Sequence, residues 1–416
     1  MAESTIITRV FPSLQDVDAQ AWNALLARQP HATPFMRHEY LAALESSGSA
    51  VPETGWAARP VTLWRDGRLV AACPLYVKGH SYGEYVFDWA WANAYEQHGL
   101  PYYPKAVVAV PFTPVPGARL LAEDAATRQA LLHAARDWCA EQGLSSLHLL
   151  FAAGEDMAAS GGEGFMPRHT VQFHWTNVAP TLGTGVSSLP PEGALAALGQ
   201  PGGGLAGYAD WDAFLAALSQ DKRKKIRQER RKVQEAGVSF RWARGAQITA
   251  ADWDFFYRCY ERTYLEHGNP PYLTRDFFAR MARHMPQHWL LFVAERGGRP
   301  IASSLIALSG DPGCEQVAYG RYWGALERVD CLHFEACYYQ PIAWCIAHGV
   351  QRFEGGAQGE HKMARALMPV QADSAHWLAH PAFADAVDRF LEREGEGVAR
   401  YLDHLQGRSP FRHGPA

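Results

Sequence analysis

The densest group of reactive side chains in the sequence lies between residues 353 and 362, which read FEGGAQGEHK. Gln358, Glu360, His361 and Lys362 supply an amide, a carboxylate, an imidazole and an ammonium group within five residues. These groups suit general base catalysis and the stabilisation of an oxyanion. Three glycines in the same segment allow the backbone to approach a ligand closely. A capped turn without catalytic function is the alternative interpretation.

A segment upstream, LHFEACYYQ at 332–340, adds two more candidates, His333 and Glu335. If the segment is helical, His333 shares a face with Cys337 and Glu335 lies on another face. We expect both candidates to lie close to the 353–362 cluster. A buried, hydrogen-bonded His333 is the commoner meaning of such a pattern. Further residues are assigned to substrate binding: Tyr319, Arg321, Gln358, Gly359 and His376.

These residue types indicate separate catalytic roles. Glu360 or His361 is the expected base, and Lys362 or a backbone N–H group within 356–359 is expected to face the oxyanion. Metal binding by the histidines at 361, 376 and 380 is an alternative. No metal-ligand spacing such as HExxH is present, so we expect no metal ion.

A very basic stretch, KRKKIRQERRK at 222–232, contains eight cations in eleven residues. The pattern favours a helix that binds phosphate or pyrophosphate, with Arg227, Arg230 and Arg231 as the expected contacts. The alternative is a solvated helix face beside a linker. Because the whole chain is slightly acidic, so many clustered cations exceed what solubility requires.

A second candidate anion site is the turn PFTPVPGAR at 111–119, which follows an apolar strand at 106–110. A turn that contains glycine can direct backbone N–H groups at a phosphate, and Arg119 adds a cation. A proline-rich loop that merely reverses the chain is an equally good interpretation. The expected contacts of a bound cofactor in this turn are Thr113, Val115, Gly117, Ala118 and Arg119.

The composition limits the class of protein. With 416 residues, 48% hydrophobic and 20% charged, the chain should fold into two or three globular domains. The net charge of −4 provides no overall basic field for nucleic acid, so any anion site must be local. No apolar run approaches the length of a membrane span, and no signal peptide is visible. Seven cysteines without a CxxC pair indicate reduced thiols and a cytoplasmic protein.

The elements that must position these groups are indicated by an internal repeat. Four strings recur in the same order along the chain: RDGR at 65 and RGGR at 296, YGEY at 82 and YGRY at 319, WC at 138 and 344, and MP with HW at 166 and 368. In each copy we expect helices first, then a hairpin, a strand with the YGxY string, a helix with WC, and strands. This order predicts an α/β fold with a mixed sheet.

The two copies are separated by residues 178–207, which are rich in Gly, Pro, Ser and Ala. This composition predicts a linker or surface loop. We therefore expect one domain at 1–177 and another at 208–416. The second should begin with a basic helix at 211–235, broken near 219–221.

Several strings resemble the Fem-like branch of the GNAT acyltransferases, the predicted peptidoglycan-biosynthesis N-acyltransferases. The resemblance rests on SYGEYVFDWAW at 81–91, YYPK at 102–105, PFTPVPGARLL at 111–121, KRKKIRQERRKV at 222–233, LHFEACYYQ and FEGGAQGEHK. It implies two tandem GNAT-like domains, each a mixed, mostly antiparallel sheet flanked by helices. The long linker and the absence of the glycine turn from the second copy depart from the family pattern.

The resemblance also implies amide formation, in which an amine attacks an activated acyl carrier. The expected carrier is acyl-CoA, used as a co-substrate and not tightly bound. The alternative carrier is aminoacyl-tRNA, as in the Fem peptidyltransferases, whose acceptor is a peptidoglycan-precursor peptide. A binding protein without catalysis is the remaining alternative. The sequence leaves the amine acceptor and the oligomeric state open.

Overall fold

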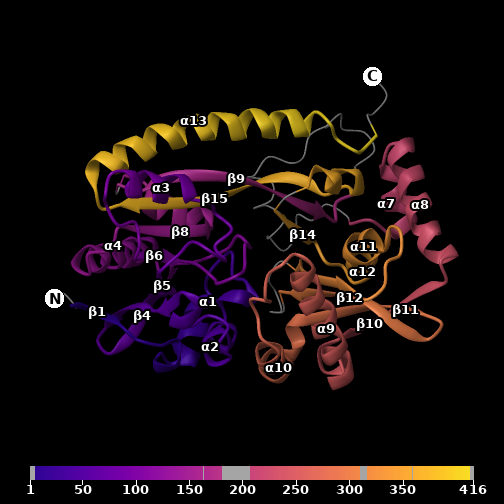
Figure 1. Cartoon of the computed structure of the whole chain (residues 1–416), viewed down its shortest axis with the longest axis horizontal. Coiled ribbons are helices and arrows are strands. Elements are labelled where there is room, and N and C mark those ends of the chain that lie inside the picture. The colour runs from indigo at the N-terminus through magenta and orange to yellow at the C-terminus, as the bar shows by residue number, and fades with distance from the viewer. Residues whose placement is uncertain (1–4, 163, 180–206, 310–315, 358, 413–416) are drawn as a thin grey trace. The chain divides into compact units, whose positions relative to one another are not determined.

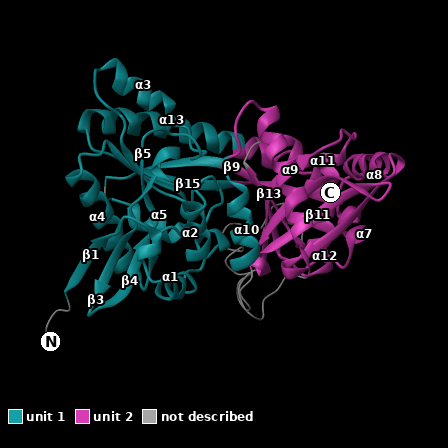
Figure 2. Cartoon of the chain, turned by 60° about the horizontal axis from the view of Figure 1, so that its bottom comes forward, with its two compact units in different colours: residues 1–170, 272–284, 371–401 teal, residues 171–271, 285–370, 402–416 magenta. Residues whose placement is uncertain are grey.

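The computed structural model describes residues 5–162, 164–179, 207–309, 316–357 and 359–412 (Figure 1). The chain divides into two compact units, each built from separate stretches of sequence (Figure 2). Unit 1 comprises 1–170, 272–284 and 371–401, and unit 2 comprises 171–271, 285–370 and 402–416. Neither unit is a continuous segment such as 1–177 or 208–416. Most of the predicted linker, 180–206, lies outside the described residues.

Unit 1 is an α/β unit that contains two sheets. Its strands are β1 (Ile6–Val10), β2 (Trp56–Ala58), β3 (Val61–Arg65), β4 (Arg68–Cys73), β5 (Leu75–Lys78), β6 (Lys105–Val108), β7 (Leu121–Ala122) and β8 (Ser146–Ala152). Its helices are α1 (Ala19–Leu26), α2 (His38–Ser46), α3 (Trp89–Gln97), α4 (Ala125–Glu141), α5 (Gly154–Ser160), α10 (Arg275–His284) and most of α13 (Pro381–Gln406). The order β1-β3-β4-β7 is antiparallel throughout.

The second sheet region of unit 1 runs β15-β8-β6-β5-β2, where β15 is Met368–Leu378. Only β6 and β8 pair in parallel. The core below these strands includes Leu75, Val108, Leu132 and Leu149, all fully buried. Asp124 caps the first turn of α4 by accepting a hydrogen bond from the Thr127 N–H, so this helix begins where its sequence supplies a cap.

Unit 2 is a second α/β unit. Its strands are β10 (Val238–Arg244), β11 (Trp289–Arg296), β12 (Arg299–Leu308), β13 (Val317–Ala325), β14 (Arg352–Ala357) and the second half of β9 (Met166–Thr176). Its helices are α7 (Trp211–Ala217), α8 (Gln220–Glu235), α9 (Ala250–Glu266), α11 (Leu332–Phe334), a π-helical turn (Glu335–Tyr339) and α12 (Gln340–Ala347). The strand order is β10-β11-β12-β13-β14-β9, and only β13 and β14 pair in parallel.

The repeated strings occupy like elements in most cases. The two WC strings lie on helices α4 and α12, and the RDGR and RGGR strings form the turns of the β3–β4 and β11–β12 hairpins. β9 and β15 each begin at a Met-Pro pair and carry a His-Trp pair. Both strands also pass from one unit into the other. The predicted tandem GNAT-like architecture, with mostly antiparallel mixed sheets and flanking helices, is confirmed.

One repeated string departs from this agreement. YGRY at 319 lies on β13 as expected, whereas YGEY at 82 lies in the loop between β5 and α3, so the predicted strand there is wrong. Gly83 and Tyr85 have φ values of 81° and 62°, which a strand cannot accommodate. The loop directs Glu84 into the interior, as described below.

The predicted break in the basic helix is confirmed, because Leu218 and Ser219 separate α7 from α8 in extended conformations. Helix α8 presents Ile226 and Val233 to the core of its unit and leaves most of its cations exposed. This amphipathic pattern fixes which cations remain available to a ligand.

Candidate functional site

Lys362 is held at the end of β14 by the glycines that precede it. A Cβ atom on Gly355 would lie 2.3 Å from Leu367 Cδ2 and 3.0 Å from the Phe173 carbonyl oxygen, so only glycine fits. The Lys362 ammonium donates to the carbonyl oxygens of Gly355 at 2.6 Å and Gly356 at 3.2 Å. Burial lowers the pKa of Lys362 to about 8.

His361 and Glu360 lie beside Lys362 in the 3-10 helix Glu360–Arg365 and differ in availability. The exposed His361 ring lies 6.0 Å from the Phe334 ring, and desolvation followed by the charges of Arg365 and Lys362 lowers its pKa. The imidazole is therefore neutral and able to accept a proton at pH 7. Glu360 instead accepts a hydrogen bond from Arg408 Nη1 at 2.8 Å. Of the two predicted bases, the geometry favours His361.

Glu335 forms a partly buried ion pair with the basic helix. Its carboxylate accepts hydrogen bonds from Arg230 Nε at 3.1 Å and Nη2 at 2.9 Å, and from Gln340 Nε2 at 2.7 Å. The guanidinium of Arg230 also lies 4.7 Å from the centre of the Trp211 ring. Arg230 and Glu335 thus connect α8 to the π-helical turn, and this pairing occupies one of the three arginines that were predicted to bind phosphate.

His333 lies in the same region as His361, as expected. Its ring centre is 5.5 Å from that of Trp323 and 5.6 Å from that of Tyr338. His333 is exposed, and desolvation by these rings, followed by His361 and nearby cations, lowers its pKa. His333 is therefore neutral at pH 7.

Arg365 connects these parts and was not among the predicted site residues. It is 2% exposed, and its Nη2 donates to both Glu229 carboxylate oxygens, at 2.9 and 2.8 Å. Its Nη1 donates to the His361 carbonyl oxygen at 2.7 Å, and its guanidinium stacks 3.5 Å from the centre of the Phe334 ring. Arg365 therefore ties the His361 segment to helix α8. The only sequence signal was its place within an already polar segment.

A hollow of about 400 Å³ lies along helix α8, and we call it the α8 hollow. It is lined by Asp221, Lys224, Lys225, Gln228, Glu229, Lys232 and Cys331. Its three lysines outnumber its two carboxylates, one of which, Glu229, is paired with Arg365, so its charge suits a phosphate or pyrophosphate group. Cys331, with φ 65°, starts the helical run 332–347 directly after the turn that follows β13.

Arg227 and Arg231 are exposed cations on α8, and Arg231 Nε donates to Glu235 Oε1 at 2.7 Å one turn along the helix. Arg227, Arg231 and Arg230 do not line the α8 hollow; the neighbouring lysines do. The basic stretch was thus identified from the sequence, but the sequence did not show which of its cations share a concave surface.

Other predicted substrate-binding residues of unit 2 are placed as follows. Tyr319 is 2% exposed on β13, and the guanidinium of Arg321 lies 5.1 Å from the centre of the Tyr322 ring. Gly359 has φ 102°, and a Cβ atom there would meet the His361 ring at 2.3 Å. Glycine at 359 therefore permits the position of the His361 ring. Gln358 lies outside the described residues.

The turn at 111–119 uses its polar groups to hold itself together. The N–H groups of Val115, Gly117 and Ala118 donate to the carbonyl oxygens of Thr113, Phe151 and His31, at 2.9, 3.1 and 2.9 Å. The Thr113 hydroxyl group donates to the Pro111 carbonyl oxygen at 3.0 Å and contacts the Tyr40 hydroxyl at 3.2 Å. In this conformation these donors bond the turn to itself and to the segments at His31 and Phe151, and phosphate binding by this turn stays a prediction.

Arg119, the last residue of this turn, is buried and forms hydrogen bonds with the turn's own backbone. It is 1% exposed, and its guanidinium donates to the carbonyl oxygens of Leu150 at 3.1 Å and Gly117 at 3.2 Å. Its own N–H group donates to Asp156 Oδ2 at 2.6 Å, and burial raises the pKa of Asp156 to about 6. Arg119 thus acts as an internal brace of unit 1 in the geometry observed.

His376 lies in unit 1, whereas His361 and Lys362 lie in unit 2. It is 1% exposed, and its Nδ1 lies 2.7 Å from Nδ1 of His148. Burial lowers the pKa of both histidines, that of His148 to about 3. The structure therefore places His376 in the interior of unit 1.

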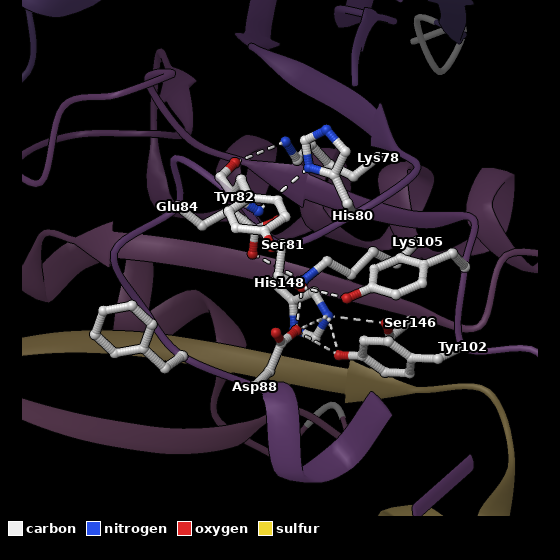
Figure 3. Close-up of polar contacts among 12 residues, drawn as sticks. Lys78, His80, Ser81, Tyr82, Glu84, Asp88, Tyr102, Lys105, Ser146 and His148 are labelled. Atoms are coloured by element: carbon white, nitrogen blue, oxygen red, sulfur yellow. Dashed lines mark hydrogen bonds and ion pairs between the residues drawn. The ribbon is translucent and has the colours of Figure 1, made fainter. Parts of the chain in front are cut away.

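Next to these histidines lies a buried charge network that the sequence analysis missed (Figure 3). Lys105 is fully buried and donates to Ser81 Oγ and Glu84 Oε2, both at 2.8 Å, and to Asp88. Asp88 Oδ2 also accepts from the Tyr102 hydroxyl at 2.6 Å. Although burial alone would lower it, the two carboxylates raise the pKa of Lys105.

A second lysine, Lys78, is also inside this network. Its ammonium donates to the Tyr82 carbonyl oxygen at 3.1 Å and lies 3.5 Å from the centre of the Trp56 ring. Burial lowers the pKa of Lys78 to about 7 and raises that of Glu84 to about 7. In the sequence, the strings SYGEYVFDWAW and YYPK contain Glu84, Asp88 and Lys105. The family resemblance included both strings but assigned these charged residues no role.

Two possible features find no support among the residues that the structure describes. These residues include no group of three or more histidine, cysteine or acidic side chains able to hold a metal ion. Within the same described ranges, each helix is too short or too polar to cross a bilayer.

Solved structures share the fold of this chain at low identity. FemX has a TM-score of 0.51 and 10% identity, and the match covers 89% of this chain and 98% of FemX. L-PGS from Bacillus licheniformis has a TM-score of 0.51 and 12% identity, covering 90% of this chain and 97% of L-PGS. No curated protein sequence matches this chain significantly.

A family comparison covers nearly the whole chain. The sequence model of the FemAB-like family, described as peptidoglycan biosynthesis/recognition, matches residues 13–180 and 204–413. These ranges include the buried charge network, helix α8 and the His361–Lys362 segment. The chain therefore belongs to the FemAB-like family of peptidoglycan biosynthesis and recognition proteins.

Proposed function

We propose that this chain is an N-acyltransferase that joins an activated acyl group to an amine acceptor. The observation that carries the proposal is that His361, Lys362 and the α8 hollow lie in one unit of a FemAB-like chain. Arg365 connects these parts, because it contacts both the His361 carbonyl oxygen and Glu229, which lines the hollow. The structural neighbours FemX and L-PGS share the fold of this chain, and its family is described as peptidoglycan biosynthesis/recognition.

The proposed reaction uses the groups in separate roles. The amine nitrogen attacks the acyl carbon, the new C–N bond forms, and the bond from the acyl carbon to the carrier breaks. Neutral His361 accepts the proton that the amine loses and returns one to the leaving thiolate or alkoxide. Protonated Lys362 stabilises the oxyanion of the tetrahedral intermediate. Positioning supplies much of the remaining acceleration.

The donor is proposed to carry phosphate groups that bind in the α8 hollow. Acyl-CoA fits this requirement, and aminoacyl-tRNA, the carrier that the resemblance to the Fem peptidyltransferases implies, is the alternative. Three lysines at a concave surface of about 400 Å³ suit the phosphates of either donor. A peptidoglycan-precursor amine or an amino-acid derivative is the proposed acceptor, and the cytoplasm is the proposed location.

The direct test is a transfer assay with the full chain. Purified protein would be incubated with isotopically labelled acyl-CoA or aminoacyl-tRNA and a panel of amine acceptors, and products would be analysed by mass spectrometry. The expected result is an amide that carries the label from one donor class. The rate of its formation should fall at least about 100-fold with Lys362→Met. Specific acceptor binding without transfer from either donor would instead support a binding protein.

A further inference from the structure

A second hollow in unit 2 shares no lining residue with the α8 hollow. It has a volume of about 450 Å³ and is lined by Trp242, Arg244, Gly245, Gln247, Gln287, Trp344 and His348. These residues come from β10, the 3-10 helices Gly245–Gln247 and Pro286–His288, and the end of α12. We call it the Trp242 hollow. Its volume is that of a small-molecule site.

Aromatic rings form two walls of the Trp242 hollow. The rings of Trp344 and His348 stack, with centres 4.0 Å apart and planes 15° apart. Trp242 stands nearly perpendicular to both, at 77° and 87°, and is 47% exposed. The rings of Trp344 and His348 therefore cover each other, whereas the exposed ring of Trp242 offers a large flat surface to a ligand.

The polar groups of this hollow favour an anionic ligand. Its lining includes one cation, Arg244, whose guanidinium lies 5.9 Å from the centre of the Trp344 ring, and no carboxylate among its residues. The side-chain amides of Gln247 and Gln287 supply hydrogen-bond donors and acceptors. Arg244 would repel a cationic ligand, so a quaternary ammonium group is a poor match.

Two nitrogen atoms at the aromatic corner complete this pattern. Trp344 is 5% exposed, and its Nε1 donor has no hydrogen-bond partner among the described residues. His348 Nδ1 donates to the Trp344 carbonyl oxygen at 2.8 Å. These nitrogen atoms add polar character to the aromatic corner.

We propose that the Trp242 hollow is a binding site for a nucleotide. The planar base stacks on Trp242, the amides of Gln247 and Gln287 meet its polar edge, and the phosphate pairs with Arg244. This site lies outside the groups assigned to acyl transfer and does not depend on them. The α8 hollow, by contrast, has phosphate-binding lysines but no aromatic ring in its lining.

The test is calorimetric titration of the full chain with AMP and with adenosine. Trp242→Ala should weaken AMP binding roughly tenfold or more, because loss of base stacking has effects of that order. Trp242→Phe should retain most of the affinity. Arg244→Gln should weaken AMP binding and leave adenosine binding nearly unchanged. Phe390→Ala, which removes another exposed aromatic ring, is the matched control.

Two controls keep the outcome separate from the proposed acyl transfer. Circular dichroism and thermal melting of each variant verify folding. Lys225→Gln with Lys232→Gln reports any AMP that binds in the α8 hollow, and AMP affinity should fall less in this variant than with Trp242→Ala. The proposal is overturned if AMP fails to bind at millimolar concentration, or if the lysine changes weaken AMP and Trp242→Ala does not. Binding of N-acetylglucosamine that Trp242→Ala abolishes, without AMP binding, would also overturn it and identify a saccharide site.

Discussion

At the scale of single residues, two lysines have pKa values near neutrality for the same physical reason. Lys362 in unit 2 and Lys78 in unit 1 are both buried, and burial disfavours their charged forms. Lys362 donates to two carbonyl oxygens and is next to the neutral His361. Its protonation state is therefore expected to affect a reaction beside His361. Lys78 faces a carbonyl oxygen and an aromatic ring.

The proposed roles predict a bell-shaped dependence of kcat on pH. His361 must be neutral, and desolvation followed by nearby cations lowers its pKa, so the rate should fall only below the pH at which an ordinary histidine gains its proton. Lys362 must be protonated, so the rate should fall as pH rises through about 8. Steady-state rates measured from about pH 5 to 9 test this prediction. His361→Ala should remove the acid limb, and a flat wild-type profile would contradict the assignment.

The buried charge network predicts a large effect of one lysine on stability. Lys105→Met leaves Glu84 and Asp88 buried without their cation, so the free energy of unfolding should fall by about 3–5 kcal/mol. Urea denaturation measures this loss. Arg389→Met, which removes an exposed cation on α13, is the control and should change stability by less than about 0.5 kcal/mol. An unchanged unfolding midpoint for Lys105→Met would mean that the network contributes little.

At the scale of elements, helix α8 combines two functions on different faces. Ile226, Glu229 and Val233 face the interior, and Glu229 pairs with Arg365. The lysines of the α8 hollow remain available for an anion. A single amphipathic helix can therefore be fixed to its unit while it presents charge.

Two arginines of α8 should differ sharply when replaced. Arg230→Ala removes the partner of Glu335, which is 4% exposed, so we expect a loss of about 1–3 kcal/mol in the free energy of unfolding. Arg227→Ala changes an exposed side chain and should cost less than about 0.5 kcal/mol. Chemical denaturation of the two variants compares them. Equal stability would mean that the Arg230–Glu335 pair is dispensable.

The sequence predicts these elements better than their contacts. The helices that open each copy, the hairpins at RDGR and RGGR, the helices with WC and the strands with His-Trp pairs followed from periodicity, turn residues and the internal repeat. The Arg365–Glu229 and Arg408–Glu360 contacts join residues far apart in sequence, so no local pattern could reveal them. The repeat predicted a strand at YGEY, residues 82–85. That prediction is wrong because Tyr85 adopts a positive φ, which a strand does not allow.

At the scale of the whole molecule, the two units are interleaved along the chain. Unit 1 takes its last segments, 272–284 and 371–401, from sequence beyond the predicted linker. β15, one of these late segments, pairs with β8 from the first part of the chain within unit 1. Continuity in sequence is thus a poor guide to which residues fold together.

This arrangement predicts an unusual result for limited proteolysis. A single cut within 178–207 should give fragments of about 20–23 and 23–26 kDa on a denaturing gel, and loss of most of the linker should trim them towards about 20 and 24 kDa. Under native conditions the fragments should stay together, because strands and helices of unit 1 come from both. Size-exclusion chromatography of the cut protein tests this directly. Two separately eluting fragments would contradict the observed composition of unit 1, and resistance at 178–207 would contradict the linker prediction.

The central claim is that the α8 hollow binds the donor while Lys362 acts in the chemical step. The measurement that tests it most directly is kcat and KM for amide formation in two variants. Replacing Lys224, Lys225 and Lys232 with Gln should raise KM for the donor about tenfold or more, with a smaller effect at high salt, and change kcat little. Lys362→Met should lower kcat about 100-fold or more and change KM little. Unchanged KM in the first variant, or wild-type kcat in the second, would contradict the account.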